Sequence, residues 1–389
     1  MTETNPYCET EPYQLRVWDQ TALAGFMHCP RYYWLAQVQG WRPNGNRVDL
    51  DWGGWIHEGA DVYIKALMAG ASPESATELA LGHVLSGTET DGGKDCFGGF
   101  YAPVWQCTDR TRTVSKKGIK RCPWSYKEHL ADGSEADDYG NPMCPKCHRP
   151  AILRTAYICE EKVKNRRTLA RSLVALCDAF AKSSLKPKRL SDGRIGSEIR
   201  WFRELSVQSP DGMPYLMTGS FDQVAEEAGR TVIPELKTTR KDPNEGYYAQ
   251  HSTGVQVHTY AWAADAQFPG ESPKMLLAVI HVTATNTEIY FRTIRISPGS
   301  LAEWERDIGF WISFSEDLAR NARLREEQGL DPAEAFPRRL TACNGMPSAP
   351  TTPCPLRDIC RLDPSDRELF LAGNFHKDPW SPIGVKGAQ

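Results

Sequence analysis

The stretch "RTVIPELKTT", residues 230–239, combines the pattern of a buried β-strand with charges that such a strand rarely carries. Val232, Ile233 and Leu236 are branched apolar residues of the kind that favour the interior of a sheet. Glu235 and Lys237 lie in the same run, and because side chains on a strand alternate between its two faces, they share one face. A carboxylate and an ammonium group on the inner face of a core strand indicate a functional site.

The residues before this strand predict its partner. Residues 218–239 alternate between apolar and polar side chains on both sides of residues 227–230, which is typical of a β-hairpin with a four-residue connection. The register of this hairpin places Asp222 directly opposite Glu235. Pro234 is a reason for caution, because proline favours a bulge, and a bulge would shift the register by one residue.

Asp222, Glu235 and Lys237 are therefore expected to converge on one face of the sheet. Like charges opposite one another destabilise a sheet by up to about 1 kcal/mol, and a divalent cation would offset this repulsion. Carboxylate oxygens suit Mg²⁺ or Mn²⁺, which orient water and neutralise charge during phosphodiester hydrolysis. Lys237 would orient or activate the attacking water or stabilise charge on the phosphate oxygens. A solvent-facing stripe of charged residues is the alternative interpretation.

Asp222 and, thirteen residues further on, Glu235-Leu236-Lys237 resemble the Asp and the (Asp/Glu)-x-Lys of the PD-(D/E)XK nuclease superfamily. The stretches "GSFDQV", "ELKTT" and "QVHTY" also follow the order of the motifs in its RecB-like branch. The resemblance implies an α/β fold of the restriction-endonuclease-like type, with a mixed central sheet flanked by helices. It further implies catalytic roles for Asp222, Glu235, Lys237, Gln256 and Tyr260.

Gln256 and Tyr260 are four residues apart, so on a helix they share one face. The resemblance implies that this face is aimed at the metal-bound water and the DNA backbone. Ordinary packing on a helix surface is the alternative.

The stretch "DWGGWIHEGADVYIKALMAG", residues 51–70, predicts a glycine-rich turn that enters an amphipathic helix, with His57 in its first turn. In RecB-like nucleases a histidine in such a helix is an additional metal ligand. The resemblance therefore implies this role for His57, and an imidazole ligand favours manganese. A hydrogen-bonded structural histidine is the alternative. Glu198, or alternatively Glu204, matches an acidic residue that often precedes the Gly-x-x-Asp strand in this branch.

The chain contains twelve cysteines, no recognisable signal peptide and no apolar run long enough for a membrane span. We expect a reducing compartment, the cytoplasm of a bacterial or phage-infected cell, where so many cysteines indicate metal sites rather than disulfides.

Cys29 near the start of the chain and Cys343, Cys354 and Cys360 near its end resemble the iron–sulfur clamp of CRISPR-associated RecB-like nucleases and of the helicase-nuclease AddB. The resemblance implies a 4Fe-4S cluster that joins the two ends of the chain. Ten residues separate Cys343 from Cys354, where the family usually has two. Four thiolates also suit zinc, which is the alternative occupant.

A second group of cysteines lies in the middle of the chain. Cys144 and Cys147 in "CPKC" have the spacing of a zinc knuckle, and Cys107 and Cys122 would complete a four-cysteine Zn²⁺ site. The alternative ligands for the second half of this site are Cys96, Cys159, His129 and His148.

Two basic stretches predict contacts with DNA phosphates. The first, "DRTRTVSKKGIKRC" at residues 109–122, carries Lys116, Lys117, Lys120 and Arg121. The second is "KVKNRRTLAR" at residues 162–171. A solvated charged surface is the alternative for both.

A chain of 389 residues can bury a substantial core and is expected to form two or three units. We expect a helical N-terminal segment over residues 1–89, a cysteine-rich insertion over 90–160, the nuclease core over 161–335 and a C-terminal clamp segment over 336–389. The net charge of −3 excludes a globally basic DNA-binding protein, although it leaves room for a local basic channel.

Together the motifs predict a metal-dependent DNA exonuclease that acts on single strands or duplex ends in recombination, repair or replication, in a phage or a bacterium. Recombination or replication proteins are candidate partners, and no membrane is expected. One alternative is a trimming nuclease for CRISPR spacer acquisition, which the zinc insertion disfavours. The other is a non-catalytic DNA-binding protein on a nuclease scaffold, which Asp222, Glu235 and Lys237 disfavour.

Overall fold

The computed structural model describes residues 14–44, 48–89, 95–107, 113–115, 118–120, 125–126, 151–210, 212–345, 353–378 and 380. For the strands between residues 100 and 157 it gives the course of the backbone without the side chains. Cys122, Cys144, Cys147, Lys116, Lys117 and Arg121 lie outside the described residues, and Cys107 and Lys120 lie in strands without described side chains. The zinc site and the basic loop therefore stay predictions.

A five-stranded mixed sheet forms the centre of the molecule, in the order β14-β13-β12-β11-β8. Its strands are β8 (Lys186–Pro187), β11 (Ala225–Glu227), β12 (Arg230–Thr239), β13 (Lys274–Val282) and β14 (Thr287–Ile294). β12 runs parallel to β13, whereas β13 and β14 are antiparallel. A second sheet has the order β1-β10-β9 and consists of β1 (Val17–Asp19), β9 (Ser197–Gln208) and β10 (Pro214–Gln223).

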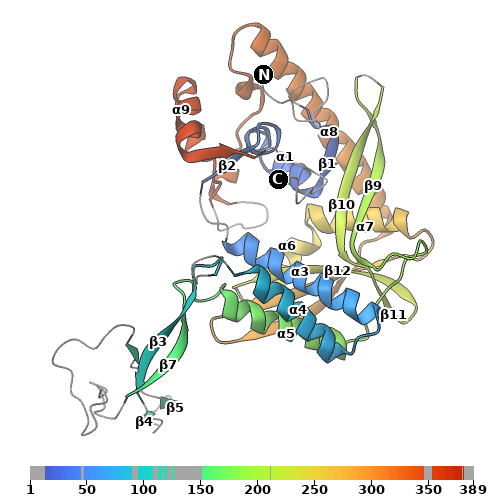
Figure 1. The fold of residues 1–389 in the computed structure, drawn as a ribbon. Coiled ribbons are helices and arrows are strands. Elements are labelled where there is room, and N and C mark those ends of the chain that lie inside the picture. The colour runs from blue at the N-terminus through green and yellow to red at the C-terminus, as the bar shows by residue number, and fades with distance from the viewer. Residues whose placement is uncertain are drawn as a thin grey trace, which may run out of the picture.

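Helices cover both faces of the five-stranded sheet (Figure 1). α3 (Val48–Met68) and α5 (Arg166–Lys182) pack on one face, against Leu236, Ala278 and Ile280, and α4 (Pro73–Gly87) packs on both of these helices. α7 (Val255–Gln267) packs on the other face, against Leu277 and Val279, and α1 (Gln20–His28) and α8 (Pro298–Glu327) pack on α7. Alternate residues of β13 thus enter different cores, as the two-residue period of a strand requires. This arrangement confirms the predicted α/β class.

The hairpin between β11 and β12 has a tighter turn than the sequence predicted. Ala228 and Gly229 have φ angles of 49° and 76°, and two consecutive positive values are typical of a two-residue hairpin turn. Glu227 pairs with Arg230, so the connection has two residues and not four.

The predicted register holds only as far as Ala225, which pairs with Val232. Beyond this pair the chain leaves the sheet, because β10, which carries Asp222, belongs to the other sheet. Asp222 is therefore not a ladder partner of Glu235, and that part of the prediction was wrong. Pro234 causes no bulge, since β12 stays in register with β13 from Val232 to Thr239. Proline has no N–H to donate to a neighbouring strand. On the side of β12 that faces β11 the pairing stops at Val232, so no donor is needed at Pro234.

The helix that carries His57 starts earlier than predicted. α3 begins at Val48 and continues through Gly53 and Gly54, so His57 lies in its third turn and not in its first. Trp52 and Ile56 are fully buried on this helix, and their burial outweighs the weak helix propensity of two glycines.

The two ends of the described chain pack together. α2 (Pro30–Tyr33), the π-helix η1 (Trp34–Val38) and β2 (Trp41–Pro43) follow α1. Near the other end come η2 (Pro332–Ala335), η3 (Leu340–Asn344), η4 (Ile359–Arg361), α9 (Pro364–Asn374) and β15 (Phe375–Lys377). β15 pairs with β2, and Phe336 is fully buried against the rings of Tyr33 and Trp34.

A long hairpin leaves the body between α4 and α5 (Figure 1). It consists of β3 (Phe100–Cys107) and β7 (Ala151–Ile158), with the short β4 (Thr113–Ser115), β5 (Gly118–Lys120) and β6 (Ser125–Tyr126) at its far end. Within the described part of the chain, no helix has the length and apolar character needed to cross a membrane.

Candidate active site

Asp222 connects the two sheets. One of its carboxylate oxygens, Oδ2, accepts a hydrogen bond of 2.9 Å from the backbone N–H of Leu236, so the end of β10 is held against the middle of β12. The other oxygen lies 3.2 Å from Nδ1 of His57 on α3. Asp222 and Glu235 therefore approach each other through a side-chain contact between sheets rather than through a shared ladder.

Glu235, Lys237 and Gln256 form a closed set of hydrogen bonds. Lys237 Nζ lies 2.6 Å from Glu235 Oε1 and 2.7 Å from Gln256 Oε1, and Gln256 Nε2 donates to Glu235 Oε1 over 2.8 Å. Both donors thus reach the same oxygen of Glu235. The other oxygen, Oε2, is buried and has no hydrogen-bond partner among the described residues. An unpaired buried carboxylate oxygen is costly, and a metal ion is one group that would satisfy it.

Glu198 joins this cluster from β9. Its carboxylate, an oxygen of Asp222 and a ring nitrogen of His57 all lie within 4.8 Å of one another, close enough to coordinate one ion. Glu198 has a φ of 49°, which is strained for a residue with a side chain, and such strain is frequently found at functional sites. Glu204, the alternative from the sequence, lies further along β9, opposite Leu216, and is exposed.

The charges in the cluster shift one another's protonation. Burial opposes the charged form of His57, but the Asp222 carboxylate outweighs it and raises the pKa of His57 to about 9. Burial raises the pKa of Glu235 to about 7, and the negative charge of Asp222 adds to the effect. For Asp222, burial opposes ionisation, but His57 and Lys237 outweigh it and lower the pKa. Without a metal, the protein holds protons at positions that a cation would replace.

Tyr260 lies one helical turn after Gln256 on α7, and Nε2 of Gln20 on α1 donates to the Tyr260 hydroxyl over 3.4 Å. The sequence predicted that Tyr260 faces the DNA backbone. Its side chain is only 3% exposed, so its hydroxyl lies in the interior instead. The contact of Gln20 with Tyr260 could not be predicted from the sequence, because the two residues lie 240 positions apart.

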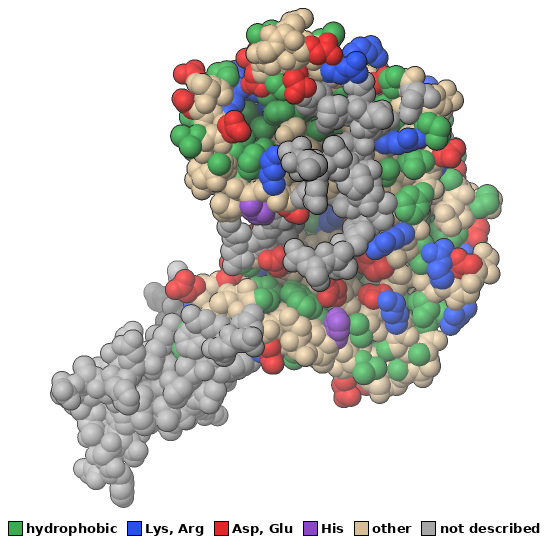
Figure 2. Space-filling view, turned by 45° about the horizontal axis from the view of Figure 1, so that its top comes forward, with side chains coloured by type: hydrophobic (Ala, Val, Ile, Leu, Met, Phe, Trp, Pro, Cys, Tyr) green, Lys and Arg blue, Asp and Glu red, His purple; other side chains and the backbone are tan. Residues whose placement is uncertain are grey.

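The donor set fits a hard divalent cation. Asp222, Glu198 and Glu235 supply carboxylate oxygens, the usual ligands of Mg²⁺ and Mn²⁺, and His57 supplies one nitrogen. On the face shown in the space-filling view, acidic and basic side chains lie close together across the middle of the body (Figure 2).

The four cysteines of the predicted clamp are brought together from the two ends of the chain. Burial raises the pKa of Cys354 to about 11, and the neighbouring thiols of Cys360, Cys29 and Cys343 add to the effect. The backbone N–H of Cys354 also donates to the carbonyl of Cys343 over 3.2 Å. Among the described residues, no three of these sulfurs lie within 4.8 Å of one another.

Three cations of the second basic stretch contact other parts of the protein. Lys164 is only 5% exposed, the Arg166 guanidinium contacts the Leu85 carbonyl and Glu89, and Arg171 binds backbone carbonyls of the loop between β13 and β14. These three cations therefore serve protein partners rather than DNA phosphates.

A comparison with family models matches residues 145–361, more than half of the chain, to the PD-(D/E)XK nuclease superfamily. The chain belongs to this superfamily. Nucleases of this kind hydrolyse phosphodiester bonds and typically use Mg²⁺ or Mn²⁺, and membership implies DNA as the substrate. The superfamily predicted from the sequence is therefore confirmed.

Comparisons with individual proteins add little to this result. The crystal structure of SSO0001 is 17% identical with a TM-score of 0.22, and the match covers 35% of this chain and 55% of that one. This chain thus matches only about half the length of SSO0001. The crystal structure of a candidate exonuclease from Eubacterium rectale is 11% identical with a TM-score of 0.40, and the match covers 100% of this chain and 99% of that one. The search of curated proteins gave no match.

Proposed function

We propose that this protein is a metal-dependent DNA exonuclease with Asp222, Glu235, Lys237 and His57 at its active site. The unpartnered Oε2 of buried Glu235 carries this proposal, because Glu235 lies beside a cluster that joins two carboxylates to an imidazole, and the N–H of the next residue, Leu236, donates to Asp222 of that cluster. Asp222, Glu235 and His57 would hold the cation, and Glu198 would complete the set. A bound Mg²⁺ or Mn²⁺ neutralises charge on the phosphate and favours ionisation of a water molecule.

The protein's own residues then position the reactants. Burial opposes the charge of Lys237, but Glu235 outweighs it and raises the pKa of Lys237, so this side chain acts as a cation and not as a base. Its ammonium group donates to a phosphate oxygen or to the attacking water. The attacking water loses a proton to solvent as its oxygen bonds to phosphorus, the bond from phosphorus to the leaving oxygen breaks, and the leaving oxygen takes a proton from solvent. Gln256 keeps Lys237 and Glu235 in this arrangement through its amide.

The order of the motifs supports attack at DNA ends. The Gly-x-x-Asp, Glu-x-Lys and Gln-x-x-x-Tyr motifs succeed one another as in RecB-like nucleases. We assign the exonuclease activity to recombination, repair or replication of phage or bacterial DNA on the same basis.

Cys29, Cys343, Cys354 and Cys360 are proposed to hold a 4Fe-4S cluster. Four thiolates are the ligand set of such a cluster, and the thiols of Cys360, Cys29 and Cys343 all lie close enough to Cys354 to raise its pKa. Arg31 is 5% exposed and lies near Cys360, while Arg338 donates to the carbonyl of Cys360, so two cations would offset the charge of four thiolates.

Hydrolysis of end-labelled DNA in the presence of Mn²⁺ or EDTA tests the active site. Glu235→Gln and Asp222→Asn are expected to lower kcat by at least about 100-fold, because each weakens a metal ligand at nearly constant volume. Glu204→Gln is the matched control, since this exposed acid on β9 lies outside the cluster. Turnover by either cluster variant at the rate of the control would refute the assignment.

The same assay on two forms of one DNA molecule tests the mode of attack. A linear duplex should be degraded from its ends, while the covalently closed circle should persist. Cleavage of the circle at a comparable rate would show that the protein is an endonuclease, and only the assignment as a DNA nuclease would then remain.

A further inference from the structure

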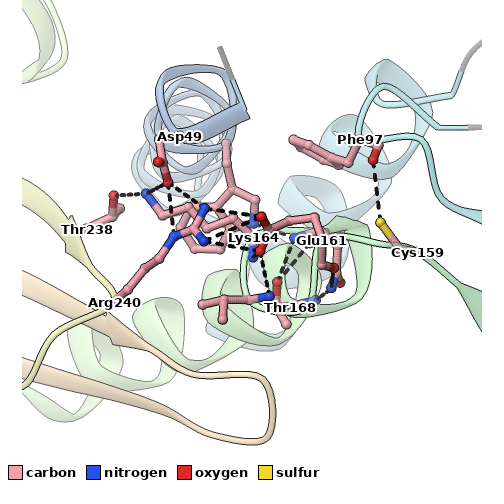
Figure 3. A network of polar contacts seen from close by, with 11 residues as sticks. Asp49, Phe97, Cys159, Glu161, Lys164, Thr168, Thr238 and Arg240 are labelled. Atoms are coloured by element: carbon pink, nitrogen blue, oxygen red, sulfur yellow. Dashed lines mark hydrogen bonds and ion pairs between the residues drawn. The ribbon is translucent and has the colours of Figure 1, made fainter. Parts of the chain in front are cut away.

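A buried lysine connects three elements next to the candidate metal site. Lys164, which immediately precedes α5, is 5% exposed, and its Nζ lies 3.2 Å from Oγ1 of Thr238 and 3.0 Å from Oδ1 of Asp49 (Figure 3). The same ammonium group lies 5.4 Å from the centre of the Trp52 ring. A hydroxyl, a carboxylate and an aromatic face therefore surround this cation.

Each of these partners belongs to an element that carries a residue of the candidate active site. Asp49 and Trp52 lie in the first turns of α3, the helix that carries His57. Thr238 directly follows Lys237 on β12. The two elements are also in direct contact, because a Cβ placed on Gly53 of α3 would lie 3.9 Å from Oγ1 of Thr238.

Among the cations that join α3 to the end of β12, Lys164 is the buried one. Arg240 also joins β12 to Asp49 and to Glu161, over 2.9 Å and 3.3 Å, but its side chain is 38% exposed. Exposed ion pairs contribute about 0–1 kcal/mol, whereas a buried cation is sensitive to the loss of any partner. The indole N–H of Trp52 further donates to the carbonyl of Asn165 over 3.2 Å, which fixes α3 to the start of α5.

We propose that Lys164 is a positioning residue for the metal site. By holding the first half of α3 against the end of β12, it sets the distance between His57 and the carboxylates of Asp222 and Glu235. The inference rests on the proposed function, because it requires that these three residues bind a cation.

The chain contains a matched control at the other end of the same strand. Lys188 donates to Oγ1 of Thr231, lies 2.6 Å from Oε2 of Glu271 and is 5.3 Å from the centre of the Phe268 ring. It thus has the same three kinds of partner as Lys164. These three partners all lie outside α3, so the polar contacts of Lys188 brace β12 without a bond to the helix that carries His57.

The experiment measures Mn²⁺ affinity by calorimetry for the wild type, Lys164→Met and Lys188→Met, with His57→Ala as the reference for a lost ligand. Lys164→Met is expected to weaken Mn²⁺ binding by roughly 10–100-fold, the usual effect of removing a residue that orients metal ligands. Lys188→Met should change it by less than about threefold. The direction of the change in Mn²⁺ affinity is informative. Removing a positive charge near a cation site would by Coulomb's law alone tighten binding, whereas losing a positioning residue weakens it.

Equal Mn²⁺ affinity in the two methionine variants would overturn the inference, and so would tighter binding in Lys164→Met. A wild type that does not bind Mn²⁺, or that binds it as weakly as His57→Ala, would instead refute the proposed metal site. The two failures are therefore distinguishable.

A second pair of variants decides the matter if Lys164→Met does not fold. Thr238→Val removes the hydroxyl that accepts from Lys164, and Thr231→Val removes the one that accepts from Lys188 and donates to Glu271. Weaker Mn²⁺ binding in Thr238→Val than in Thr231→Val supports the inference, and equal binding overturns it.

Discussion

At the scale of single residues, the candidate active site of the metal-free protein contains charges that are balanced by protons. His57 is protonated beside Asp222, because this carboxylate outweighs the effect of burial and raises the pKa of His57. Glu235 holds a proton close to neutral pH, because burial and the charge of Asp222 both raise its pKa. Metal ligands bind through lone pairs, so a cation must displace these protons. We infer that metal affinity increases with pH over the physiological range.

The same shifts predict how the stability of the metal-free protein depends on pH. For His57, whose pKa rises from 6.5 to about 9, the stabilising charge is complete below pH 6.5 and is lost as the pH rises through 9. Glu235, whose pKa rises from 4.5 to about 7, acts in the same direction between those values. The free energy of unfolding in EDTA should therefore fall from pH 5 to pH 9, by an amount on the order of 2 kcal/mol for His57.

Urea denaturation across this range measures the effect. His57→Asn should abolish the fall between about pH 7 and 9, whereas His281→Asn, in the same sheet but outside the cluster, should keep it. A wild-type stability that is flat or rises over this interval would contradict the assigned His57–Asp222 pair.

At the scale of elements, the sequence predicted which residues converge but not how. Alternation along β12 identified Glu235 and Lys237 as residues of one face, and both contact the same cluster. The route of Asp222 was not predictable, because the chain leaves the hairpin at Val224, whose N–H donates to the carbonyl of Gly196. Gly196 permits this crossing, since a Cβ there would lie 2.4 Å from the carbonyl oxygen of Val224. No local pattern in β10 predicts that Asp222 contacts His57, which lies far earlier in the sequence.

The residues of the candidate site were also only partly predictable from the sequence. Glu198 was only one of two candidates in the sequence, and its distance to His57 and Asp222 separates it from Glu204. Lys164 was hidden within a basic stretch, where charge suggested solvent exposure. Its burial depends on Trp52 and Asp49 in another helix, which pairwise spacing along the chain cannot reveal.

The packing of α3 gives a prediction that uses two glycines of one helix. A Cβ on Gly59 would lie 2.7 Å from the side chain of Leu173, which is fully buried, whereas a Cβ on Gly54 meets nothing within 4 Å. Gly59→Ala should therefore destabilise the protein by about 1–3 kcal/mol through overpacking. Gly54→Ala should stabilise it by about 0.5–1 kcal/mol, since alanine is the better helix former.

Thermal or urea unfolding of both variants tests this packing. If Gly59→Ala were as stable as Gly54→Ala, then α3 would not lie against α5 as closely as described.

At the scale of the whole molecule, the segments at the two ends are joined by contacts that do not need a metal. His28 lies 3.2 Å from the carbonyl of Ala342, Arg31 donates to the carbonyl of Phe336 over 2.9 Å, and Arg339 contacts the carbonyl of Met27. The proposed iron–sulfur cluster would therefore reinforce an interface that packing already forms.

Removing one thiol tests the proposed cluster. Anaerobically purified protein should contain about four iron and four sulfide ions per cluster, with the visible absorption of thiolate-bound iron. Cys29→Ser, Cys354→Ser and Cys360→Ser should each abolish both, while Cys177→Ser, a change of a buried cysteine in α5, should keep them. Colourless protein with stoichiometric zinc in the clamp would replace the cluster with a zinc site.

The contact between His28 and Ala342 spans 314 positions, and this separation sets a timetable for biosynthesis. A ribosome that adds about 5–20 residues per second needs roughly 15–60 seconds to reach Ala342 after His28 has been made. Throughout that interval Cys29 lacks its partner thiols, and the rings of Tyr33 and Trp34 lack Phe336. The nascent chain therefore lacks the C-terminal contacts of Cys29, Tyr33 and Trp34 while β12 and α7 are already available to fold, so the contacts between the two ends form last.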